Sequence, residues 1–156
     1  MIKYYEIGNI GAEKNFPNIK AHTDMQNYEF VTADFVTKTT AYANAATKKA
    51  DGLFLIMNTV AGDLLWDDKT IKKGDCVNLK SLKSLDQKFL EIDGVHITGG
   101  LGSVAVGTKL GVGSDGKLIP IPAGSKHTVD VGFSMDGLQF IGVGAGARYR
   151  FIANYF

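Results

Sequence analysis

The chain has 156 residues, 45% of them hydrophobic and 21% charged. It is therefore long enough for one domain with a substantial core and too apolar for a disordered polypeptide. Its 17 Lys and Arg residues against 16 Asp and Glu leave a net charge of +1, which excludes the basic surplus of a nucleic-acid binder, and its single cysteine excludes an intrachain disulfide or a cysteine-based zinc site.

The first 30 residues are polar and lack a sustained period, but they contain several aromatic residues, namely Tyr4, Tyr5, Phe16, Tyr28 and Phe30. Such a segment is too aromatic for a solvated tail. It forms either an extended arm on another surface, such as a neighbouring subunit, or a segment packed on its own domain. We therefore separate residues 1–30 from a single β-rich domain at residues 31–156.

Apolar signals in the N-terminal half are short. Met1–Glu6 has no apolar run after its lysine, so we expect no secretory signal and synthesis in the cytoplasm. Thr40–Ala50 has the only composition that fits an α-helix, which Asp51 and Gly52 would end. The next run, Leu53–Met57, is continuously apolar and predicts a strand buried on both faces, although it is too short to cross a membrane as a helix.

Two further strands are expected in the middle of the chain, at Asp75–Leu79 and Lys88–Ile92. The first contains Cys76, which we interpret as a small buried hydrophobic residue. Between these strands, leucines at positions 79, 82 and 85 fit one helical turn that faces the core.

Glycines dominate the C-terminal part, where residues 99–156 hold 13 of the 19. Because glycine weakens helices and allows the positive φ of tight turns, this region should consist of short strands and turns. Alternation predicts strands at Thr128–Phe133 and Arg148–Phe151, the second with two arginines on one face and two aromatics on the other. Pro120 and Pro122 place Ile119–Pro122 at a sheet edge or strand end.

The sequence also contains two predicted hairpin turns and one repeated glycine pattern. Met135–Gly137 and Ser114–Gly116 both contain Asp-Gly and predict hairpin turns. In addition, Gly74, Gly107 and Gly124 each precede Asp, Thr or Ser just before a predicted strand. We interpret this irregularly spaced pattern as one turn geometry used repeatedly to begin strands.

Glycine fingerprints for dinucleotide binding occur at Gly111–Gly116 and Gly142–Ala147. That site requires a helix immediately after the glycines. A proline-containing stretch follows the first match, and a strand-like alternation follows the second. Both matches are therefore interpreted as turn or packing glycines.

No catalytic, cofactor or metal site is predicted. His22, His96 and His127 lie far apart in the sequence and outside any metal-binding motif. Asp63, Asp67 and Asp68 surround the single tryptophan, Trp66, and we interpret them as a solvated loop anchored by that ring. The predicted fold class is mainly β: a compact antiparallel β-barrel or sandwich with at most one or two short helices and an extended N-terminal arm.

The stretches Lys73–Val77 and Ala105–Leu110, followed by Asp115–Leu118, resemble small capsid decoration (cement) proteins of tailed bacteriophages. The resemblance covers about residues 73–156. It implies a non-enzymatic protein on the virion surface that binds the lattice of the major capsid protein, often as a trimer. It carries over no binding residue.

From this resemblance we expect a capsid decoration protein that self-associates and binds neither nucleic acid nor membrane. Two alternatives remain open. One is another virion component, such as a head fibre base or a tail or baseplate protein. The other is a soluble β-barrel that binds a small ligand or carbohydrate, in which Trp66 and the tyrosines provide stacking surfaces.

Overall fold

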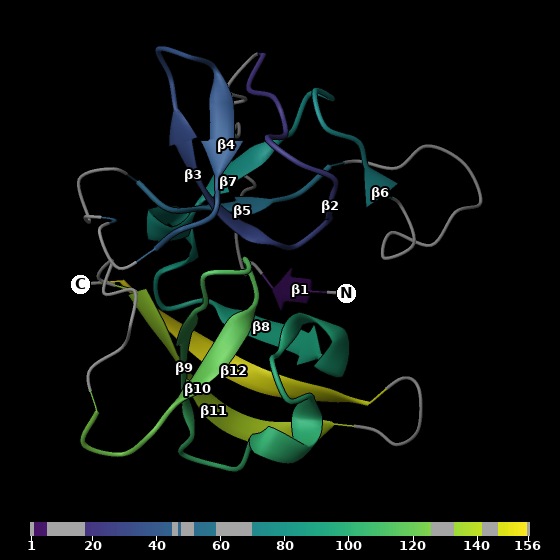
Figure 1. The fold of residues 1–156 in the computed structure, drawn as a ribbon. Coiled ribbons are helices and arrows are strands. Elements are labelled where there is room, and N and C mark those ends of the chain that lie inside the picture. Colours follow the sequence, from purple (N-terminus) through teal and green to yellow (C-terminus); the bar gives the residue numbers. More distant parts are fainter. Residues whose placement is uncertain are drawn as a thin grey trace.

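The computed structural model describes residues 2–5, 18–44, 47, 52–58, 70–125, 133–141 and 147–155. Their strands form three sheets, in the orders β4-β3-β5-β7, β2-β6 and β1-β8-β12-β11-β9-β10. Figure 1 shows the four-stranded sheet in the upper half and the six-stranded sheet in the lower half. The predicted mainly β, antiparallel fold is confirmed, and the described strands form a sandwich-like arrangement of open sheets.

The upper layer is built around a strand that is buried on both faces. Its strands are β3 (Phe30–Asp34), β4 (Thr39–Ala41), β5 (Phe54–Ile56) and β7 (Leu79–Ser81), next to the small sheet of β2 (Met25–Gln26) and β6 (Thr70–Ile71). β5 lies between β3 and β7, and all three of its residues are buried. This confirms the strand predicted from the apolar run at Leu53–Met57.

The lower layer shows the alternation expected of a sheet with one buried face. It contains β1 (Ile2–Tyr5), β8 (Phe89–Asp93), β9 (Lys109–Val112), β10 (Leu118–Ile121), β11 (Phe133–Ile141) and β12 (Arg148–Tyr155). On β12, Tyr149 and Phe151 are buried whereas Arg148 and Arg150 are partly exposed, as predicted. Pro120 lies in the edge strand β10, also as predicted.

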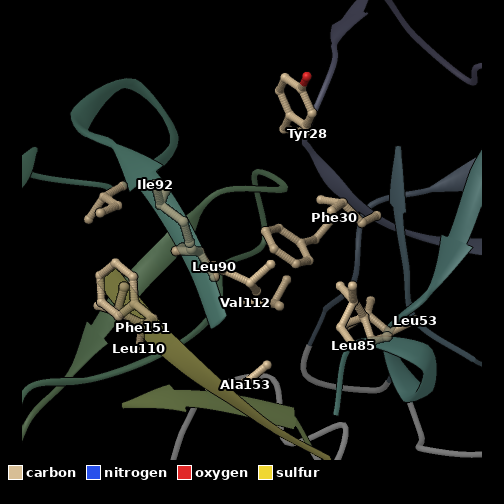
Figure 2. Packing of buried hydrophobic residues seen from close by; sticks show 14 of the residues in the cluster. Tyr28, Phe30, Leu53, Leu85, Leu90, Ile92, Leu110, Val112, Phe151 and Ala153 are labelled. Carbon is tan, nitrogen blue, oxygen red and sulfur yellow. The ribbon is translucent and has the colours of Figure 1, made fainter. Parts of the chain in front are cut away.

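Two hydrophobic clusters lie on opposite faces of the four-stranded sheet. Figure 2 shows the larger one, in which Phe30, Leu53 and Leu85 meet Leu90, Val112 and Phe151 of the six-stranded sheet. The smaller cluster contains Val31, Phe54 and Ile56 together with residues that precede β2 and β7. Neighbouring residues of β3 and β5 thus point to different clusters, because side chains alternate along a strand.

The helices are short 3-10 turns: η2 (Leu82–Leu85), η3 (Gly94–His96) and η4 (Leu101–Ser103). Leu82 and Leu85 are fully buried, which confirms the predicted core-facing turn. The helix predicted at Thr40–Ala50 is wrong at its start, because Thr39–Ala41 pairs with β3 as β4. Threonine favours the pleated conformation when a partner strand is present. Residues 45–46 and 48–50 lie outside the described part of the chain.

The hairpin predicted at Met135–Gly137 is also wrong. β11 continues through these residues, with an irregularity in register between Gly137 and Gln139. Gly137 donates its N–H to the carbonyl of Thr108 at 2.9 Å, and its own carbonyl accepts from Gly107 at 2.9 Å. A Cβ atom on Gly137 would lie 2.9 Å from the Ala105 carbonyl oxygen. The glycine therefore permits a close neighbouring chain rather than a turn.

The second predicted hairpin is confirmed, since Ser114–Gly116 connects the antiparallel strands β9 and β10. Gly116 has φ +77° and its carbonyl accepts from the Phe30 N–H at 2.8 Å. A Cβ atom there would lie 2.6 Å from Cε1 of Tyr42. This turn of the lower layer therefore contacts the upper layer directly.

The repeated turn geometry is confirmed. The N–H of Asp75, Thr108 and Ser125 donates to the carbonyl three residues earlier at 2.9, 3.0 and 3.0 Å, and the glycine before each has φ between +77° and +89°. These are the features of a type II turn. In the first two turns the Asp or Thr side chain also accepts from the first residue's N–H. Pro122 has no N–H, so the third turn lacks that bond.

The described residues near the N-terminus pack on the rest of the chain. β1 pairs with β8, and Ile19, Ala21 and Met25 belong to the smaller hydrophobic cluster. Residues 6–17, which make up much of the predicted N-terminal arm, lie outside the described part of the chain. The strand predicted at Thr128–Phe133 lies outside the described residues except for Phe133, the first residue of β11.

Candidate docking surface

The turn between β3 and β4 presents apolar side chains to solvent. Val36 is 91% exposed and Phe35 is 49% exposed. The Asp34 carboxylate accepts hydrogen bonds from the N–H groups of Val36 at 2.8 Å and Thr37 at 3.1 Å, which fixes the turn. The hydrogen bonds from Thr37 and then Val36 lower the pKa of Asp34, so the carboxylate is ionised. We call residues 34–38 the hairpin tip.

Phe35 connects the hairpin tip to the body of the upper layer. Its ring meets the ring of Phe54 edge to face, with centroids 5.9 Å apart. This contact and the Asp34 hydrogen bonds hold Val36 on a preorganised turn. A fixed apolar side chain loses little conformational entropy when it enters a partner's pocket.

A second exposed apolar region lies where β9 begins and β10 ends. The repeated turns at residues 105–108 and 122–125 border a hollow of about 600 Å³, whose apolar lining is Val106, Ile121, Pro122 and Ala123. Val106 is 75% exposed. We call this region the turn face. Figure 1 places these ends of β9 and β10 at the bottom of the molecule and the β3–β4 hairpin at the top.

The turn face continues onto β11. Because Gly137 is bonded to Gly107 and Thr108, the exposed Leu138 lies next to the first turn. Phe140, also exposed, contacts the edge of Tyr149 with ring centroids 6.3 Å apart. Apolar side chains from two distant segments thus share one surface. The sequence does not show this grouping, because it depends on the irregular register of β11.

The outer face of the six-stranded sheet carries a charged cluster. Glu91 on β8 lies opposite Arg150 on β12, and its side chain is 4% exposed. Its carboxylate accepts from Arg150 at 2.7 Å and lies 3.7 Å from Arg148. The Nε atoms of both arginines are buried without a hydrogen-bond partner among the described residues. Sequence analysis found the two arginines but not the carboxylate that they share.

The two described histidines have different surroundings. His22 is partly buried, with Nδ1 2.9 Å from the Thr40 hydroxyl oxygen and its ring edge-on to Tyr42. Burial and the nearby Lys73 lower the pKa of His22. His96 is buried and contacts Asp93 and the backbone of Asn27. The hydroxyl that His22 contacts belongs to Thr40, which is buried and out of reach of a substrate, and the contacts of His96 are to a carboxylate and a carbonyl.

The prediction that Cys76 is buried is wrong, because its side chain is exposed. Val77 is buried, and Cys76 points to the opposite side. Among the described residues, an isolated bridge between Lys20 and Cys76 forms at this point, and the strand itself starts at Leu79. The strand predicted at Asp75–Leu79 is therefore shifted toward the C-terminus, whereas Lys88–Ile92 corresponds to β8.

A partly buried acid–phenol pair lies next to the β9–β10 turn. The Tyr42 hydroxyl donates to Glu29 Oε2 at 2.6 Å. Burial raises the pKa of Glu29, and burial together with the Glu29 carboxylate raises the pKa of Tyr42. Glu29 also borders a polar hollow of about 320 Å³ with Asp24 and Lys117. Since Tyr42 packs on Gly116, we assign the pair a structural role at the contact between layers.

The described side chains and glycine motifs form neither a metal site nor a dinucleotide site. In the described residues, no three His, Cys, Asp or Glu side chains are close enough to hold a metal ion. His127 and the residues around Trp66, namely Asp63, Asp67 and Asp68, lie outside the described part. Gly111–Gly116 forms strand and turn followed by β10, so it lacks the helix of a dinucleotide site. Gly142–Gly146 is not described.

Comparison with known proteins gives no family. No family model, curated protein or solved structure matches the chain significantly. Within the described residues, no helix has the length and apolar character needed to cross a membrane.

Proposed function

We propose that the chain is a non-enzymatic structural protein of a phage virion, a decoration protein that binds the capsid lattice at the virion surface. The observation that carries the proposal is the presentation of valines on hydrogen-bonded turns, with Val36 and Val106 both more than 70% exposed. Docking of such a side chain into a pocket of the lattice removes apolar area from water, at about 25 cal/mol per Å².

Self-association belongs to the same proposal. The hairpin tip and the turn face lie far apart on the molecule, so one can bind the lattice while the other contacts a second copy. In a cyclic assembly, every copy uses its surfaces in the same way. Gel filtration with light scattering measures the number of copies directly.

The first experiment measures whether purified particles of the encoding phage contain the chain in a fixed stoichiometry and lose heat stability without it. Particles that lack the chain, or whose heat stability does not depend on it, would contradict the proposal.

The second experiment measures the occupancy of particles by Val36→Asp and Val106→Asp variants. A buried valine contributes about 1.5–3 kcal/mol, so at least one variant should bind about tenfold or more weakly. The control is Thr98→Asp, which introduces the same carboxylate at an exposed polar position and should bind as the wild type does. If both valine variants also bind like the wild type, these surfaces do not contact the lattice.

The hollow at the turn face favours one other function, binding of a small ligand. Its lining combines an apolar floor with the polar side chains of Thr108, Lys109 and Ser125. A thermal-shift screen with glycans and metabolites tests this function. A ligand that stabilises the wild type but not a Lys109→Ala variant would favour it over the virion role.

A further inference from the structure

Two arginines of β12 lie on the outer face of the six-stranded sheet. Tyr149, which separates them in the chain, is buried in the larger hydrophobic cluster, so Arg148 and Arg150 point to the opposite face. Their Cα atoms are about 6.6 Å apart at the usual rise of a strand, a spacing at which two guanidinium groups reach the same anion. The two side chains are 28% and 37% exposed, so each of them reaches solvent.

One carboxylate serves both arginines. Glu91 Oε1 accepts a hydrogen bond from Arg150 Nη2 at 2.7 Å, and Glu91 Oε2 lies 3.7 Å from Arg148 Nη1, too far for a hydrogen bond. Two positive groups and one negative group leave this cluster with a charge of +1. Asp93 lies opposite Arg148 in the β8–β12 register, but its carboxylate contacts His96 at 2.8 Å, and no ion pair with Arg148 forms among the described side chains.

Most of the hydrogen-bonding capacity of the two guanidinium groups is unused. Each group has five N–H donors. Within the described part of the chain, the single hydrogen bond that the two groups make is the one from Arg150 to Glu91, and both Nε atoms are buried without an acceptor. Because buried donors are normally satisfied, an additional acceptor at this place would improve the hydrogen bonding of the cluster.

We infer that Arg148 and Arg150 form a binding site for an oxyanion, a carboxylate or a phosphate, on the outer face of the six-stranded sheet. Glu91, which is 4% exposed, holds Arg150 in place and leaves the guanidinium of Arg148 to bind the ligand. Guanidinium groups bind oxyanions through pairs of parallel hydrogen bonds. The site is separate from the hairpin tip and the turn face, so the inference does not depend on the proposed virion function.

The neighbouring positions on the same face are apolar and distinguish two sources of the oxyanion. Phe89, which is 44% exposed, lies opposite Ile152, and the two residues follow Glu91 and Arg150 at a distance of two positions along their strands. A protein segment that presents Asp or Glu beside an apolar side chain would cover this pair and remove apolar area from water. A free phosphate ion would leave the pair exposed.

The first experiment follows the Nε–H signals of Arg148 and Arg150 in ¹⁵N–¹H NMR spectra of the wild-type protein. The probes are sodium phosphate and the peptide acetyl-Glu-Ala-Leu-amide, added at constant ionic strength with sodium chloride as the reference. We expect both signals to shift and to saturate with at least one probe. The probe that binds more tightly identifies the source, either free phosphate or the acidic side chain of a protein. If neither probe shifts the signals more than chloride does, the inference is wrong.

The second experiment measures the affinity of variants for the tighter probe. Arg148→Gln removes a guanidinium that makes no hydrogen bond with the described residues, so this variant should fold and bind about tenfold more weakly. Glu91→Gln removes the competing carboxylate and should bind more tightly. The control is Lys72→Gln, which removes an exposed cation paired with Asp24 and should bind as the wild type does.

Equal affinities of the wild type and Arg148→Gln would overturn the inference, because the probe would then bind elsewhere or only through the general charge of the protein. If Glu91→Gln does not fold, the comparison of the wild type with Arg148→Gln still decides.

Discussion

The two layers of the molecule use their faces differently. The four-stranded sheet is apolar on both sides, since β5 contributes Leu55 to one hydrophobic cluster and Phe54 and Ile56 to the other. The six-stranded sheet has one apolar face, and Glu91 with its arginines lies on the other. The upper layer is therefore the structural centre of the domain, whereas the lower layer has a polar face on which substitutions cost less unless they break a buried pair.

The largest expected effect comes from the apolar contact between the layers. Phe30→Ala removes a fully buried ring from the larger cluster and should lower the free energy of unfolding by about 3–5 kcal/mol, measured by urea denaturation. Phe89→Ala is the matched control, because this ring is 44% exposed on the six-stranded sheet, and should cost less than about 1 kcal/mol. Equal losses of stability in the two variants would contradict the claim that the contact between the layers stabilises the protein more than the polar face of the six-stranded sheet does.

The second prediction concerns the charged cluster on the polar face. Glu91→Gln leaves two guanidinium groups without their shared carboxylate and should cost about 2–3 kcal/mol, less than for a fully buried pair because both arginines reach solvent. Asp24→Asn breaks the exposed pair with Lys72 and should leave the free energy of unfolding unchanged within error. Urea unfolding at low and high salt separates the two, and an effect of Glu91→Gln as small as that of Asp24→Asn would contradict this account.

The third prediction compares two glycines with positive φ. Gly116→Ala should cost about 2–3 kcal/mol, because the new Cβ adds a collision with Tyr42 to the backbone strain. Gly74→Ala should cost only about 1 kcal/mol, because nothing lies within 4 Å of its Cβ position. Thermal and urea unfolding of both variants measure the difference. Similar losses of stability in the two variants would mean that the β9–β10 turn can move away from Tyr42 at little cost.

The smallest expected effect is that of Asp93→Asn on the free energy of unfolding at acidic pH. Although burial alone would raise the pKa of Asp93, the hydrogen bond and charge of His96 lower it. A lowered pKa gives stability that is present above about pH 4 and is lost as the pH falls. Asp93→Asn should therefore cost about 1–2 kcal/mol at pH 6 and show a weaker loss of stability toward pH 3.

The carboxyl group of Glu29 should change the stability with pH in the opposite direction to that of Asp93. Because burial raises the pKa of Glu29, the folded protein gains stability from this group as the pH falls through its titration. Glu29→Gln should thus steepen the acid loss that Asp93→Asn reduces. Parallel acid profiles for both variants would contradict the assignment of either carboxyl group.

Patterns confined to neighbouring residues were sufficient to predict several elements. The apolar run at β5, the alternation on β12 and the three glycine turns all occur as expected, because side-chain period and φ preference are local properties. Local preference failed where a distant segment supplied a partner. Thr39–Ala41 became a strand because β3 pairs with it, and Gly137 stayed in β11 because the chain at residues 105–108 approaches it closely.

The sequence by itself determined that this protein is built from short antiparallel strands and glycine turns. Only the tertiary structure decided how the strands are aligned across the sheets, and this alignment produces the candidate surfaces. It places Glu91 against two arginines, turns Cys76 outward, joins Gly137 to Gly107 and Thr108, and brings His96 to a carbonyl 69 residues away. The physical reason is that a strand's own period fixes which residues share a face, whereas register and packing fix which residues meet.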